Sequence, residues 1–73
     1  LDPRMKREIE RVLIELNRGG VTIFFATHDM PEAQRLSTEI AFMRDGIILG
    51  IERKEKVVKR YGNVENYWLE LGG

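Results

Sequence analysis

The sequence has 73 residues, with twelve Lys and Arg residues against twelve Asp and Glu residues, one histidine and no cysteine. A chain of this length forms one domain at most and buries only about 60% of the surface that its unfolded form exposes. No disulfide can compensate for the small core, and the zero net charge argues against nucleic acid or an anionic membrane as a partner.

The first predicted element is a helix that begins at Pro3, because Asp2 is a good N-cap and proline suits the first helical position. Gly19-Gly20 supplies the positive-φ residue that ends helices. The charged run from Arg4 to Arg11 is interpreted as a solvated helix face. Apolar side chains at helical spacing predict one buried stripe, made of Met5, Ile9, Val12, Leu13 and Leu16.

The next segment, Val21 to Thr27, is rich in β-branched and aromatic residues and is apolar on both alternating faces. This pattern predicts a strand that is covered on two sides, as in a parallel sheet. The run is far shorter than the ~20 residues that a membrane-spanning helix needs. Helix, Gly-Gly turn and strand form half of a βαβ unit, whose first strand would precede Leu1. We therefore expect the C-terminal part of a larger α/β domain, with an incomplete parallel sheet.

A short second helix is predicted after Asp29, which forms a capping box with Glu32. This helix should end near Ser37. Its inward side should consist of Met30, Ala33 and Leu36.

A β-hairpin should follow, because two β-prone runs, Glu39 to Arg44 and Ile47 to Ile51, are separated by Asp45-Gly46, which suits a two-residue type I′ turn. Lys54 to Tyr61 is predicted to be a charged helix that Gly62 ends. The last segment, Val64 to Leu71, fits either a helix or a strand, and the helix is favoured.

The only histidine, His28, lies between the predicted buried strand and the second helix. In open parallel sheets, ligands collect outside the carboxyl ends of the strands, so a histidine there can hydrogen-bond a phosphate. A lone histidine in such a place more often satisfies a backbone carbonyl, and both interpretations stay open on these residues alone. A metal site with Asp29 and Glu32 is not expected, since helix capping already explains their spacing.

Several segments in their order along the chain resemble the ATP-binding subunits of ABC transporters. Leu1-Asp2-Pro3 is similar to the end of the D-loop, and His28 is similar to the switch histidine. The final segment resembles the closing helix of subunits that serve drug-exporter-like systems. The segments that carry the resemblance are Leu1 to Pro3, Gly20 to Ala26, Thr27 to Ala33, Arg44 to Ile48 and Val64 to Leu71.

The resemblance implies that two ATP-binding subunits close around two ATP molecules with Mg²⁺, at the cytoplasmic face of the membrane, where permease subunits hold them. His28 would contact the γ-phosphate of ATP. Leu1 and Asp2 would lie at the interface between the two ATP-binding subunits, and Asp2 would also serve as an ordinary N-cap. Residues 1–50 would belong to the α/β core of the domain and residues 51–73 to a C-terminal helical extension.

The chain lacks the other parts of a P-loop ATPase: the Gly-rich loop with its lysine, the Mg²⁺ ligands and the catalytic carboxylate. The parent protein would be an ATPase, whereas the isolated chain should be inactive and should bind no ATP. The alternative is a small stand-alone α/β protein-interaction module that never meets nucleotide. We also expect the isolated chain to self-associate, because the predicted strand has lost its neighbours.

Overall fold

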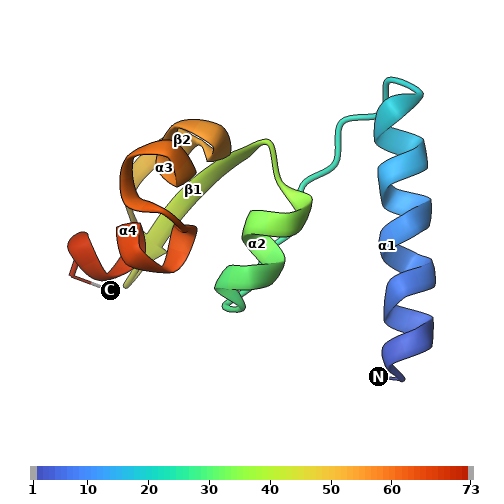
Figure 1. Cartoon of the computed structure of the whole chain (residues 1–73), viewed down its shortest axis with the longest axis horizontal. Helices are drawn as coiled ribbons and strands as arrows, with labels where there is room; N and C mark the ends of the chain where they lie inside the picture. The colour runs from blue at the N-terminus through green and yellow to red at the C-terminus, as the bar shows by residue number, and fades with distance from the viewer. Residues whose placement is uncertain (1, 73) are drawn as a thin grey trace.

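The computed structural model describes residues 2–72, which form four helices and one two-stranded antiparallel sheet (Figure 1). Figure 1 shows the first helix standing apart from the other elements, joined to them by an extended segment. The presence of both helices and a sheet confirms the expected α/β character. The elements in chain order are α1 (Pro3–Arg18), α2 (Met30–Leu36), β1 (Glu39–Arg44), β2 (Ile47–Arg53), α3 (Lys54–Tyr61) and α4 (Val64–Glu70).

Helix α1 begins and ends as the sequence predicts. The Asp2 carboxylate accepts a hydrogen bond of 2.8 Å from the Arg4 N–H, and Gly20 has a φ of 101° just beyond the last turn. The prediction of a buried stripe is wrong for this chain, because no residue of α1 is buried and Met5 remains 55% exposed. Burial needs a second surface, and no described element covers the apolar side of this helix.

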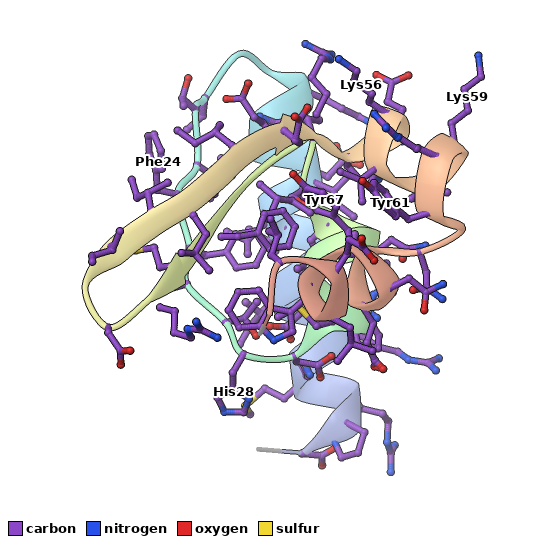
Figure 2. The ribbon with its side chains drawn as sticks, turned by 90° about the vertical axis from the view of Figure 1, so that its left-hand side faces the viewer. Phe24, His28, Lys56, Lys59, Tyr61 and Tyr67 are labelled. Atoms are coloured by element: carbon purple, nitrogen blue, oxygen red, sulfur yellow. The ribbon has the colours of Figure 1, made fainter. Side chains whose placement is uncertain are left out.

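The prediction of a buried strand over 21–27 is likewise not met. The segment is extended but has no strand partner among the described residues, and its Phe24 side chain is 95% exposed. Figure 2 shows Phe24 pointing away from the body of the chain. A strand exists only where a neighbour accepts and donates its backbone hydrogen bonds, and the two strands that are present pair only with each other.

The hairpin is confirmed, with β2 extending two residues further than predicted. Asp45 and Gly46 have φ values of 52° and 77°, the positive pair that a type I′ turn requires. The register passes from Phe42 opposite Gly50 to Met43 opposite Ile48, which leaves Leu49 as the extra residue of a β-bulge. The sheet is antiparallel, so residues 2–72 contain no parallel pairing.

The core lies where the hairpin meets α3 and α4. Helix α3 has the predicted bounds, Gly62 ends it with a φ of 89°, and the last segment is a helix as favoured. Phe42 of β1 packs against Tyr67 in an edge-to-face arrangement at 5.0 Å and stacks on Trp68 at 6.1 Å between ring centroids. The buried centre consists of Phe42, Val57 and Val64.

We expect the isolated chain to self-associate, because α1 and the segment 21–27 leave large apolar side chains exposed. Sedimentation velocity over a dilution series should show an average mass that rises above that of the monomer as concentration increases. Phe24→Ser, which removes the most exposed of these side chains, should weaken the association. A monomer at every concentration would contradict this expectation.

Candidate functional site

His28 lies in the turn between the extended segment and α2, and its side chain is exposed. Two hydrogen bonds shape this turn. The Asp29 N–H donates to Thr27 Oγ1 at 3.0 Å, and the Glu32 N–H donates to Asp29 Oδ1 at 3.0 Å. Figure 2 shows His28 at the outside of the turn, pointing away from the aromatic core. An exposed imidazole in a turn held from both sides is available to a ligand.

The capping box at the start of α2 is confirmed in one half only. Asp29 caps the helix through the Glu32 N–H as predicted. In a complete capping box the Glu32 side chain would accept from the Asp29 N–H, but here Thr27 Oγ1 accepts from that N–H instead. The Glu32 carboxylate is thereby free to face α1.

Two ion pairs join α1 to α2. Lys6 Nζ lies 2.9 Å from Glu32 Oε2, and Arg35 Nη2 lies 2.7 Å from Glu10 Oε2. Hydrogen bonding to Lys6 is the main cause that lowers the pKa of Glu32, and hydrogen bonding to the Thr27 hydroxyl is the second. Glu32 in turn raises the pKa of Lys6. The order of the two pairs along the helices shows that α1 and α2 run in the same direction. Figure 1 accordingly shows both helices beginning at the lower side of the view.

Helix α2 is also attached to the C-terminal core. Gln34 Oε1 accepts a hydrogen bond of 3.0 Å from the Val64 N–H at the start of α4. Met30, two residues after His28, packs against the buried cluster that contains Phe42 and Val64. The turn that carries His28 is therefore linked to α1 through ion pairs and to the core through α2.

Sequence reasoning missed these links. It assigned Lys6 and Glu10 to a solvated face, yet both contact α2. The sequence did contain one signal for them. The first helix has a basic residue followed by an acidic one, Lys6 and Glu10, and the next helix has an acidic residue followed by a basic one, Glu32 and Arg35. Charge order alone does not show which helix faces which, because either pair could equally form contacts within its own helix.

The two residues predicted to lie at a subunit interface are Leu1 and Asp2. Leu1 lies outside the described residues. Asp2 is the N-cap of α1, and its carboxylate accepts from the Arg4 N–H. Among residues 2–72 no group of three or more His, Cys, Asp and Glu side chains converges in a way that would hold a metal ion. No helix within the same range is long and apolar enough to span a bilayer.

The chain is similar to several ATP-binding proteins of transport systems. It is 40% identical over 52 residues to a fluoroquinolones export ATP-binding protein of Mycobacterium tuberculosis. The matched region covers 71% of this chain and 17% of that protein. It is 36% identical over 64 residues to a glycine betaine transport ATP-binding protein of Bacillus subtilis, and this matched region covers 86% of this chain and 15% of that protein. The chain belongs to the ATP-binding subunits of ABC transporters.

An L-cystine import ATP-binding protein of Bacillus subtilis is 34% identical over 59 residues, covering 81% of this chain. Exporters and importers of this ABC family thus match at similar identity. The chain spans only 15% to 23% of the length of these three ABC proteins. No family model and no solved structure matches it.

Proposed function

We propose that this chain forms the switch-histidine part of an ABC transporter subunit that couples ATP hydrolysis to transport, with His28 contacting the γ-phosphate of ATP. The observation that supports the proposal most is the exposed imidazole in a turn braced by Thr27 and Asp29, within a chain that matches ATP-binding proteins over most of its length. An imidazole N–H there donates a hydrogen bond to a phosphate oxygen and orients the attacking water, which stabilises the charge that develops in the transition state.

The described residues fit a nucleotide in this one respect. Bound ATP supplies the phosphoanhydride bond whose hydrolysis drives transport. Because no described cluster of acidic side chains suits Mg²⁺, we assign its ligands to the remainder of the longer protein. The same holds for the Gly-rich loop with its lysine and for the catalytic carboxylate. The contribution of this chain is therefore the polar contact from His28.

The partners we propose are a second ATP-binding subunit and membrane-spanning permease subunits, at the cytoplasmic face of the membrane. Leu1 and Asp2 would contact the second subunit. This proposal is compatible with the N-cap that Asp2 forms, because only one of its carboxylate oxygens accepts from the Arg4 N–H and the other oxygen remains available to a partner.

We further propose that the segment 21–27 is a buried strand of a parallel sheet in the longer protein. Its apolar side chains on both faces and the exposure of Phe24 and Phe25, at 95% and 42%, support this assignment. Residues 1–50 would then be part of the α/β core, and residues 51–73 would form a C-terminal helical extension. The exposed stripe of α1 would be covered by the same sheet.

Calorimetric titration and an ATPase assay test the proposed function. The 73-residue chain alone should neither bind nor hydrolyse ATP, because one imidazole supplies too few of the contacts that phosphates require. A protein of the length of the relatives that carries this sequence should do both. Failure of that longer protein to bind ATP would refute the proposal. Tight ATP binding by the 73-residue chain would refute our assignment of the other phosphate contacts to the remainder of the protein.

A further inference from the structure

We propose that Lys6 is a positioning residue for His28. It acts through the carboxylate of Glu32, which it binds in the first turn of α2. As a statement about ATP hydrolysis this rests on the proposed function. As a statement about the geometry of the turn it stands on the contacts of this chain alone.

A continuous set of polar contacts connects Lys6 to both neighbours of His28. Lys6 Nζ lies 2.9 Å from Glu32 Oε2, and the Glu32 N–H donates to Asp29 Oδ1 at 3.0 Å. The Asp29 N–H in turn donates to Thr27 Oγ1 at 3.0 Å. His28 is the single residue between Thr27 and Asp29, so these bonds set the direction of its backbone on both sides.

Lys6 is the residue of α1 that binds the first turn of α2, which directly follows the turn of His28. Its side chain is 43% exposed, but the Glu32 side chain that it meets is only 18% exposed. A charged side chain that is largely covered depends on a cation or on hydrogen-bond donors, and Glu32 has Lys6 and the Thr27 hydroxyl in these roles. Without Lys6, Glu32 must turn towards solvent or compete with Thr27 for the Asp29 N–H, and either change alters the turn.

The same contacts reach back to the start of α1. The Lys6 N–H donates to the Asp2 carbonyl oxygen at 2.9 Å in the first turn of the helix. The second pair, Glu10 with Arg35, keeps the next turn of α1 against α2 at 2.7 Å. Movement of α1 is therefore transmitted to the turn of His28 through Glu32. In the proposed transporter this route connects the subunit interface at Asp2 with the γ-phosphate contact.

The geometric part is tested by hydrogen exchange and NMR on the 73-residue chain. In Lys6→Gln the Asp29 amide should exchange about fivefold faster, a change in line with the modest strength of a partly exposed ion pair, and the ring signals of His28 should shift. Lys6→Arg, which keeps the charge, should retain the native values. Arg11→Gln is the matched control, because it removes the exposed pair with Glu8 on the same helix.

Glu32→Gln provides a second approach to the same contact should Lys6→Gln fail to fold. It should have the same effect on the turn, and combining both substitutions should add nothing further, because each removes the same interaction. Unchanged exchange and ring signals in both single variants would overturn the proposal. So would equal changes in Lys6→Gln and Lys6→Arg.

The catalytic part is tested in the longer ATP-binding protein that carries this sequence. Lys6→Gln should lower kcat about fivefold while KM for ATP stays the same, and it should have no added effect once His28 is replaced by alanine. A normal kcat in Lys6→Gln, together with slow turnover in His28→Ala, would overturn the positioning role and leave the proposed function intact. Normal turnover in His28→Ala would instead refute the proposed function, and the exchange experiment would still decide whether Lys6 holds the turn.

Discussion

Replacing His28 by alanine in an ATP-binding protein that carries this sequence should lower kcat for ATP hydrolysis by about a hundredfold to a thousandfold, as loss of one preorganised hydrogen-bond donor does elsewhere. The imidazole acts on charge that develops at the γ-phosphate, so its loss should affect the transition state more than the bound ground state. ATP affinity and KM should therefore remain close to those of the unsubstituted protein. Steady-state ATPase kinetics and a nucleotide titration on the same samples measure both quantities.

A matched control is available on α3. Figure 2 shows Lys56 on the opposite side of the structure from His28, and Lys56→Ala removes a comparably exposed side chain without touching the turn. Its kcat should match that of the unsubstituted protein. If His28→Ala also keeps the full kcat, His28 has no role in hydrolysis. A large rise in KM with normal kcat would assign His28 to ground-state binding and contradict the proposed role.

Phe42→Ala should lower the free energy of unfolding by about 3 to 5 kcal/mol, which is the usual cost of removing a buried phenylalanine side chain. The residue is only 3% exposed and contacts both Tyr67 and Trp68. Because small domains are stable by only about 5 to 15 kcal/mol, this loss should remove a large part of the stability of the chain. Urea unfolding followed by fluorescence of the single tryptophan, on dilute samples that limit self-association, measures the change.

The neighbouring residue on β1 supplies the control for this experiment. Met43 is 56% exposed, so Met43→Ala creates no cavity and should change the free energy of unfolding by less than about 1 kcal/mol. Equal losses in Met43→Ala and Phe42→Ala would show that the cluster around Phe42 is not the core that stabilises the chain.

Elements with a local cause were predictable from the sequence. Asp2 and Pro3 begin α1, Asp45-Gly46 sets the hairpin turn, and Gly62 ends α3, each because a few adjacent residues determine the backbone angles. The family was predictable for a similar reason, since its motifs are short and follow one another in a set order. The match to ATP-binding proteins confirms that prediction.

Burial was not predictable from the same patterns. The stripe of α1 and the segment 21–27 have the apolar periodicity of buried elements, yet Met5 and Phe24 are exposed. Periodicity describes which face an element offers, whereas burial depends on whether another surface is present to cover it. Within the described residues that surface exists for the hairpin, α2, α3 and α4, which contain the buried Phe42, Ala33, Val57 and Val64.

The sequence by itself determined where helices and turns begin and end, and which family the chain belongs to. Only the tertiary structure decided how the helix that follows His28 is held: by the ion pair of Lys6 with Glu32 and by the bond from the Val64 N–H to Gln34. The physical reason is distance along the chain. Capping and turn signals act between residues that are close in sequence. These two contacts join residues far apart in sequence, so they form only when the folded chain brings the helices together.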